Sequence, residues 1–259
     1  IDGISGNQKT VRIVNGAAEF EVRLQKGESV KNYYFQVTES PVLKELRVAD
    51  SDNKNIAGNL ISKAIAYSMG VLEVNASMGL IVAAPTAGSS GVIPGVLLAL
   101  QEEYDFTDDQ IIDALFTCSA IGYLAMLNAT VAGAVGGCQA EIGVAAAMAA
   151  AAVVELMGGT PEQCTDAAST VLMNMLGLVC DPVGGLVEYP CQNRNASGAS
   201  NAIVAAEISL AGIHQLIPLD EMMDIMYTVG KKLPAELRET ALGGCALSPS
   251  ACAKCKIKH

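Results

Sequence analysis

The sequence contains no tryptophan, and it has only four phenylalanines and two histidines among 259 residues. A core without large aromatic rings has to be built from Ala, Val, Leu, Ile and Met, and the 25 glycines allow backbones to approach closely. With 51% hydrophobic and 17% charged residues, the chain can form a sizeable core, which argues against intrinsic disorder. This composition suits tightly packed helices.

Basic residues and long apolar runs are also scarce. The formal net charge is −11, and no basic patch is interleaved with aromatic residues, which argues against nucleic acid as a partner. The most apolar run, Ile142 to Val154, is shorter than the about 20 residues of a membrane span and is bracketed by Glu141 and Glu155. We therefore predict a buried core helix and no membrane association. The N-terminus shows no secretory signal, so a cytoplasmic location is expected.

The apolar spacing predicts a mainly α protein, a helical bundle-like domain with Gly-rich loops over residues 56–259. Residues 1–55 form a small β-prone N-terminal segment that could belong to another domain. Its signal is Asn15-Gly16 between two β-prone runs, which is typical of a hairpin. Capping signals at Thr107 and at Thr160-Pro161 mark two helix starts. The predicted helices span 59–70, 91–100, 111–127, 141–157, 161–176, 199–216 and 220–230.

The loop Pro85–Gly91 reads Pro-Thr-Ala-Gly-Ser-Ser-Gly and lies between two apolar helical stretches. Its amides and hydroxyls could form an anion site for a small carboxylate at a helix N-terminus. The alternative is a plain turn, because the loop lacks the lysine of a phosphate-binding loop and does not follow a strand.

Eight cysteines occur in a large apolar chain without a secretory signal, which favours reduced thiols or metal ligands over disulfides. Cys118 and Cys164 lie within helical stretches and fit buried apolar positions. Cys138, Cys180 and Cys191 lie instead beside Gly or Pro. Zinc is disfavoured because these three form no Cys-x-x-Cys pair and because histidine is scarce, and His214, on an otherwise apolar predicted helix, is expected to be structural. Three-cysteine ligation of a cluster is one interpretation, which would leave one iron available as a Lewis acid.

Longer motifs around these cysteines carry a resemblance. The three cysteines are separated by forty-one and then by ten residues. The chain resembles, over about residues 59–244, the α subunit or α domain of the iron–sulfur-dependent L-serine dehydratases, whose cluster cysteines have the same spacing. The matching segments are Glu73–Gly79, Pro85–Gly95, Gly136–Glu141, Leu176–Glu188, Pro190-Cys191, Arg194–Ala196, Gly198–Ala202, Leu237–Ala241 and Gly243-Gly244.

The resemblance implies a catalytic helical domain that acts as an L-serine ammonia-lyase, giving pyruvate and ammonia. It implies a [4Fe-4S] cluster on Cys138, Cys180 and Cys191. A lysine in a context suited to pyridoxal phosphate, the other cofactor for this chemistry, is not evident. Arg194 would clamp the substrate carboxylate, although it could instead pair with Glu141 or Glu188. The residues expected around the carboxylate are Thr86, Ser89, Ser90, Arg194 and Asn195.

The resemblance leaves the base that removes the α-proton unidentified. A histidine of a β subunit or β domain is the expectation, because the Ser-rich motif ending in His that this family carries there does not occur in the chain. The protein is also expected to be an oligomer. A cysteine of the tail, Cys252 or Cys255, could reach the open iron in the absence of substrate.

Three alternatives to the L-serine reaction are open at this point. A related cluster lyase could act on cysteine or threonine, or the chain could be a cluster-binding subunit without activity. A helical interaction module with incidental cysteines would hold no iron at all.

Overall fold

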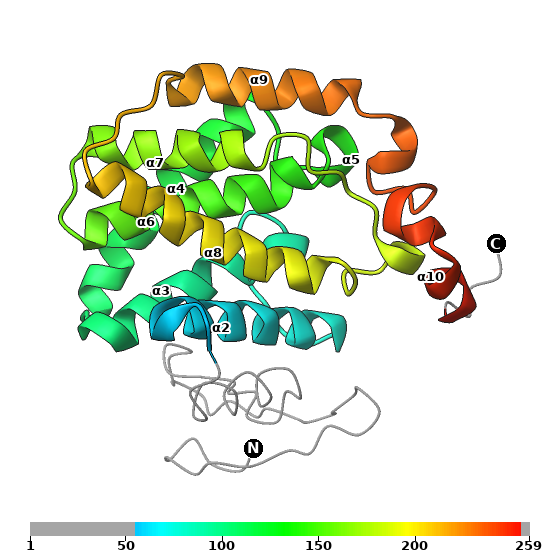
Figure 1. Cartoon of the computed structure of the whole chain (residues 1–259), viewed down its shortest axis with the longest axis horizontal. Helices are drawn as coiled ribbons and strands as arrows, with labels where there is room; N and C mark the ends of the chain where they lie inside the picture. Colours follow the sequence, from blue (N-terminus) through cyan, green and yellow to red (C-terminus); the bar gives the residue numbers. More distant parts are fainter. Residues whose placement is uncertain (1–54, 255–259) are drawn as a thin grey trace, which may run out of the picture.

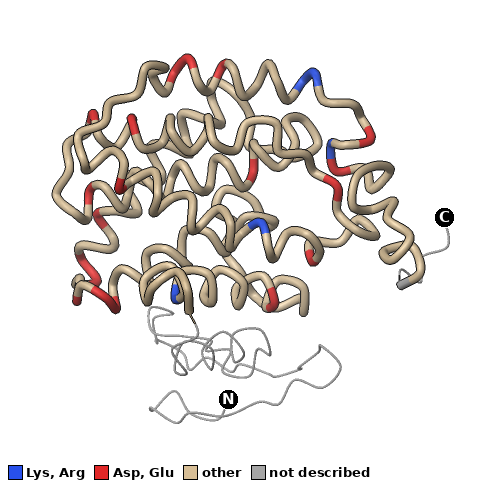
Figure 2. The backbone as a smooth tube through the Cα atoms, viewed as in Figure 1, with Lys and Arg blue, Asp and Glu red and all other residues tan. Residues whose placement is uncertain are grey.

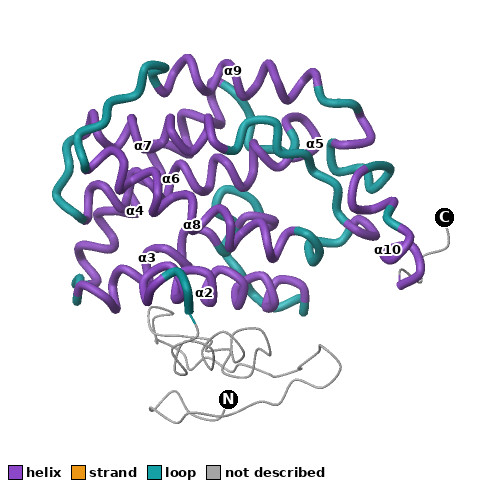
Figure 3. The backbone as a smooth tube through the Cα atoms, in the orientation of Figure 1, coloured by secondary structure: helices purple, strands orange, loops and turns teal. Residues whose placement is uncertain are grey.

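The structure is a computed structural model that describes residues 55–254. Within that range it consists of helices joined by loops, without a strand (Figures 1 and 3). The mainly α prediction is therefore confirmed, while the predicted β-prone segment lies almost entirely outside the described residues. The long helices are α2 (Gly58–Ala76), α3 (Val92–Tyr104), α4 (Asp108–Asn128), α6 (Val144–Leu156), α7 (Pro161–Asn174), α8 (Cys191–Leu210) and α9 (Leu219–Lys232).

Shorter elements connect the long helices. Two are the short helices α5 (Gly133–Gly136) and α10 (Pro249–Lys254), and the π-helical turn η3 (Gln139–Gly143) leads directly into α6. The remaining four are the 3-10 turns η2 (Ala87–Ser89), η4 (Val183–Gly185), η5 (Ala235–Leu237) and η6 (Gly244–Leu247).

Helix α6 forms the centre of the molecule. Its residues from Val144 to Val154 are all buried, and it packs against α3, α4, α7 and α8. A helix that is apolar on every side has to be surrounded by others, and its many alanines allow these neighbours to approach closely. The prediction of a buried core helix is confirmed here.

Within residues 55–254, two helices are long and apolar enough to cross a membrane by length and composition alone. The segment Gln139–Leu156 is 89% buried over the apolar window, as expected of the core helix. The other is α4, whose window is only 28% buried. Helix α4 therefore carries apolar side chains that the described part of the chain does not cover.

The predicted helix starts at Thr107 and Thr160 are confirmed. The Thr107 hydroxyl accepts a hydrogen bond from the Gln110 amide, and the Gln110 side chain accepts one from the Thr107 amide, at 3.3 and 2.9 Å. Thr160 and Gln163 form the same reciprocal pair before α7. These bonds satisfy amides that a helix N-terminus leaves without partners.

The sequence misplaced the bounds of two helices most clearly. Helix α2 continues past its predicted end at Gly70 to Ala76. Helix α8 differs most from its prediction. It begins at Cys191 and ends at Leu210, whereas the apolar pattern predicted 199–216. Its first turns are polar because they face the candidate site, so apolar periodicity did not reveal them. Gly212, at φ +81°, lies just beyond the helix end.

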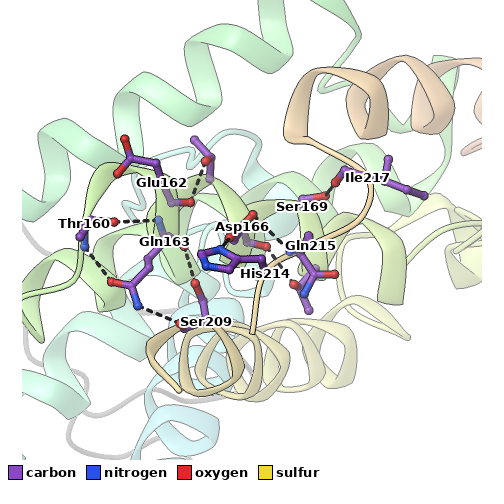
Figure 4. A network of polar contacts seen from close by, with 11 residues as sticks. Thr160, Glu162, Gln163, Asp166, Ser169, Ser209, His214, Gln215 and Ile217 are labelled. Carbon is purple, nitrogen blue, oxygen red and sulfur yellow. Dashed lines mark hydrogen bonds and ion pairs between the residues drawn. The ribbon is translucent and has the colours of Figure 1, made fainter. Parts of the chain in front are cut away.

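His214 consequently lies in a loop and not on a helix, and its side chain is 76% exposed. Its Nδ1 atom lies 2.9 Å from the Asp166 carboxylate on α7 (Figure 4). Nearby, Gln163 binds the Ser209 carbonyl and the Ser169 hydroxyl binds the Ile217 carbonyl. These contacts attach the end of α8 and the loop after it to α7. His214 therefore has a structural role in this attachment.

Acidic residues outnumber basic ones, 27 against 16 in the whole sequence, and Figure 2 shows them spread over the outer turns of the described helices. One surface cluster joins Lys63 of α2 to Glu102 and Glu103 of α3, at 3.7 and 3.1 Å. Exposed pairs of this kind contribute little to stability. The α2–α3 contact depends more on close packing, because Gly95 of α3 lies against Ala64 and Ser68 of α2.

Candidate metal centre

Cysteines from three separate segments meet beside the core helix. The ligand atoms of Cys138, Glu141 and Cys180 all lie within 4.8 Å of one another, and the three residues are buried. Cys191, the first residue of α8, is buried as well, and its thiol interacts electrostatically with Cys138 and Glu141. The structure thus brings the three predicted cysteines into one region, with Cys138 and Cys180 in the tightest group.

Glu141 is the member of this group that was not predicted as a site residue. It follows Cys138 by three positions in the π-helical turn η3, so both side chains share a face of the turn. Its Oε1 atom accepts a hydrogen bond from the Thr86 hydroxyl at 2.8 Å, and its Oε2 atom lies 3.6 Å from the Cys180 sulfur. The three-residue spacing from a candidate ligand was the signal available in the sequence.

Backbone pairing fixes Cys180. Its amide donates to the Leu237 carbonyl at 2.9 Å, and its carbonyl accepts from the Glu239 amide at 2.8 Å. Glu239 has a φ of +65°, a left-handed conformation that non-glycine residues seldom adopt. The segment before η6 therefore holds Cys180 in position.

Gly133 packs directly against Glu141 and Cys180, with no room for a side chain. A Cβ atom at this position would lie 3.2 Å from the Cys180 sulfur and closer still to the Glu141 carboxylate. Any side chain at this position would therefore press on the two groups that face it.

The Pro85–Gly91 loop reaches the same region. Thr86 contacts Glu141, and the Thr86 and Ser89 hydroxyl oxygens are 3.1 Å apart. Ser89 and Ser90 are buried, and the Ser90 hydroxyl donates to the Ala87 carbonyl at 2.8 Å. The loop predicted to bind a carboxylate thus lies next to the predicted metal ligands.

Asn195 of α8 positions this loop. Its amide group donates to the Gly88 carbonyl at 2.7 Å and to the Cys191 carbonyl at 2.8 Å, and its oxygen accepts from the Gly91 amide at 3.0 Å. The side chain is fully buried. Asn195 therefore joins the Gly-rich loop to the first turn of α8, which carries Cys191.

Arg194 pairs with Asp181, and not with Glu141 or Glu188, the two partners that the sequence analysis left open as an alternative to substrate binding. Its Nη1 atom lies 2.7 Å from Asp181 Oδ1, 2.9 Å from the Val179 carbonyl and 3.6 Å from the Cys138 sulfur. Asp181 directly follows Cys180 in the chain, and this places its carboxylate within reach. Asp181 also accepts a hydrogen bond from the Cys245 amide at 2.6 Å.

Comparison with known proteins supports the resemblance found in the sequence. The family model "Serine dehydratase alpha chain" matches residues 20–246. This chain belongs to the serine dehydratase alpha chain family. It is 50% identical over 230 residues to the "Probable L-serine dehydratase, alpha chain" of Bacillus subtilis, covering 89% of this chain and 76% of that protein.

Two further relatives show how this family is arranged. The chain is 53% identical over 196 residues to the "L-serine dehydratase, alpha chain" of Peptoniphilus asaccharolyticus, covering 76% of this chain and 67% of that protein. It is 39% identical over 207 residues to "L-serine dehydratase 1" of Escherichia coli, covering 79% of this chain but only 46% of that protein. The family segment therefore occurs both in proteins named alpha chains and as part of a longer chain.

The ionisation of the Cys180 and Cys191 thiols is consistent with a metal site. The neighbouring Cys138 thiol and burial raise the pKa of Cys180 far above its ordinary value, and burial beside Cys138 raises the pKa of Cys191 to about 12. Without a metal these thiols stay protonated at neutral pH. A bound cation would supply the positive charge that crowded thiolates need, so the donor set fits a thiolate-ligated metal group.

The carboxylates at the site have opposite behaviour. Burial raises the pKa of Glu141, because it disfavours the charged carboxylate. The hydrogen bond from Thr86 acts in the opposite direction and is the smaller effect. Burial alone would raise the pKa of Asp181 as well, but hydrogen bonds from Cys245 and the Arg194 charge outweigh it and lower the pKa. Asp181 is thus the charged partner of Arg194, whereas the pKa of Glu141, beside the thiols, is shifted in the opposite direction by burial.

Of the predicted tail ligands, Cys252 is described and Cys255 lies outside the described residues. Cys252 is exposed, and its sulfur lies 3.6 Å from the Ala246 carbonyl. Its role as a ligand stays a prediction.

Proposed function

We propose that this chain is the iron–sulfur α component of an L-serine ammonia-lyase, which converts L-serine to pyruvate and ammonia. The observation that carries the proposal is the meeting of Cys138, Cys180 and Cys191 beside the Thr86 loop. The names of the relatives, all of which specify L-serine, support this substrate over cysteine or threonine.

The proposed cofactor is a [4Fe-4S] cluster held by the thiolates of Cys138, Cys180 and Cys191. Three protein ligands leave one iron open, and that iron would act as a Lewis acid on the serine hydroxyl, a poor leaving group. The crowding of the Cys138, Cys180 and Cys191 thiols, with Arg194 as the cation that acts on Cys191 among the described residues, supports a positively charged metal group at this position.

The chain's own residues would bind and orient the substrate. The Pro85–Gly91 loop carries the hydroxyls of Thr86, Ser89 and Ser90, which suit a carboxylate. Among the described residues, the contacts of Arg194 all use Nη1, so Nη2 keeps its donors for the same carboxylate. Asn195 would orient the loop through its three hydrogen bonds and leave the binding to the loop itself.

Glu141 would link the two halves of this site. Its carboxyl contacts Thr86 on the substrate side and Cys180 on the cluster side. Its hydrogen bond with Thr86 would hold the Gly-rich loop in place, while its other oxygen lies beside the Cys180 sulfur. We propose it as a positioning residue of the reaction.

A β partner would complete the active site. Several relatives are named alpha chains, and the Escherichia coli relative is about twice as long as the matched segment. Such a partner, as a separate chain or a fused domain, would supply the base that removes the α-proton. No histidine among the described residues belongs to the metal centre, since His214 pairs with Asp166.

The test is an anaerobic assay of the reconstituted chain, with and without the β chain encoded with it. The α–β mixture should release pyruvate from L-serine with a kcat/KM at least about tenfold above the release of 2-oxo acid from L-threonine or L-cysteine. Turnover of cysteine or threonine exceeding that of serine would overturn the substrate assignment. A mixture with a full cluster and no lyase activity on any of the three would overturn the enzymatic function.

A further inference from the structure

The outer face of α4 carries a continuous apolar stripe. Six large side chains on one side of this helix are between 41% and 71% exposed: Ile112, Leu115, Phe116, Tyr123, Met126 and Leu127. Their spacing of three, four and seven residues places them on one face, opposite the buried Ala114, Cys118, Ile121 and Ala125 that pack toward α6. The stripe therefore lies on the outside of the described fold.

The size of the stripe exceeds that of an ordinary surface patch. The six exposed fractions amount to about three and a half fully exposed large side chains, or roughly 700 Å² at about 200 Å² each. The largest apolar patch on a typical monomer measures about 300–600 Å². A standard interface buries about 800 Å² per partner, so this stripe with a polar rim would suffice for a stable dimer.

The stripe is symmetric about its centre. Ser119 lies midway between Ile112 and Met126, and it is a small exposed residue at the centre of the stripe. Its hydroxyl already donates to the Leu115 carbonyl at 2.7 Å, so burying it would leave no donor unsatisfied. Two such helices crossing antiparallel at Ser119 would place Leu115 of one copy against Tyr123 of the other, and Ile112 against Met126.

Charge favours the same antiparallel arrangement. The carboxylates of α4, on Asp108, Asp109 and Asp113, all lie near its N-terminus, and no charged residue follows from Ala114 to Asn128. A parallel pair would bring both acidic ends together, whereas an antiparallel pair separates them by the length of the helix, about 30 Å.

We propose that α4 is the two-fold interface through which two copies of this chain associate. An isologous contact needs a surface that is complementary to itself. The exposed face of α4 meets that need because it is apolar, has the small Ser119 at its centre and is charged only at its N-terminal end. The proposal concerns assembly and does not depend on the proposed reaction.

The test measures the mass of the full chain by light scattering after size exclusion, without detergent. We expect twice the 26.7 kDa of one chain. Phe116→Glu should give the mass of a single chain, because two carboxylates would enter the contact. The matched control is Val204→Glu, at an exposed apolar position on α8, which should stay dimeric. Circular dichroism should show the same helix content in all three proteins.

A cross-link supplies a second measurement that does not rely on disruption. Ser119→Cys treated with a short bis-maleimide should give a covalent dimer well above the wild-type background, and Val204→Cys should not. A monomeric wild type at about 100 μM would overturn the proposal, since a standard interface binds far more tightly than that. A Phe116→Glu protein that stays dimeric would also overturn it. The same holds if the chain floats with phosphatidylcholine vesicles through α4, or if adding the β chain abolishes the Ser119→Cys cross-link, since another partner would then occupy the stripe.

Discussion

Glu141 connects the Gly-rich loop to the candidate metal ligands, and a single substitution tests this role. It is a buried carboxyl between Thr86 and Cys180, with Arg194 engaged by Asp181 instead. Glu141→Gln keeps the volume and an oxygen that can accept from Thr86, but it loses the acidic group facing Cys180. We expect kcat/KM for L-serine to fall at least about tenfold, or about 1.4 kcal/mol.

The control for this variant is Glu188→Gln, which changes an exposed glutamate in the loop before α8. It should keep wild-type kinetics. Iron content should be close to wild type in both variants, because Glu141 is proposed to position and not to ligate. Loss of iron in Glu141→Gln would show instead that the carboxylate belongs to the ligand set.

The same glutamate predicts a pH dependence of stability. Its pKa is raised in the folded chain, chiefly by burial, so its favourable contribution is complete at acid pH and is lost as pH rises through the folded pKa. Glutamine does not titrate. As pH rises from 5 to 8, the midpoint of thermal unfolding of the cluster-free wild type should therefore fall relative to that of the cluster-free Glu141→Gln protein. A difference that shrinks over this range would contradict the raised pKa.

At the scale of the element, close helix packing predicts a sharp difference between two glycines. A Cβ atom on Gly95 of α3 would lie 2.8 Å from the Ser68 Cβ and 2.9 Å from the Ala64 carbonyl of α2. Gly95→Ala should lower the free energy of unfolding by about 1–3 kcal/mol. On Gly143 the nearest atom would be 3.6 Å away, an ordinary contact, so Gly143→Ala should change stability little. Urea unfolding of both proteins measures this, and equal midpoints would contradict the packing argument.

Elements also show what apolar periodicity can and cannot predict. The capped starts of α4 and α7 were predictable because Thr107 and Thr160 each precede a glutamine by three residues. The start of α8 was not, because its first turns are polar: Asn195 serves the Gly-rich loop and Arg194 serves Asp181. Sequence patterns report burial in an apolar core, whereas these side chains are buried in a polar site.

At the scale of the whole molecule, the sequence grouped Cys138, Cys180 and Cys191 as candidate ligands. The folded chain places Cys138 and Cys180 in one group with Glu141, and the Cys191 thiol interacts electrostatically with Cys138. The expectation that Cys118 and Cys164 occupy buried apolar positions in helices is confirmed, since they are buried residues of α4 and α7. Glu141 and the Arg194–Asp181 pair were not predicted, because such contacts depend on how α8 and the loop after α7 pack. Only the folded chain shows which carboxylate is near the guanidinium.

The central claim is that Cys138, Cys180 and Cys191 hold a catalytic [4Fe-4S] cluster. The most direct measurement quantifies iron and sulfide after anaerobic purification, together with pyruvate release from L-serine in the presence of the β chain. Wild type and the control Cys164→Ser should hold about four irons per chain and be active, while Cys180→Ser should lose both iron and activity. A wild-type chain without iron after anaerobic reconstitution, or a Cys180→Ser protein that keeps its cluster and its activity, would contradict the account.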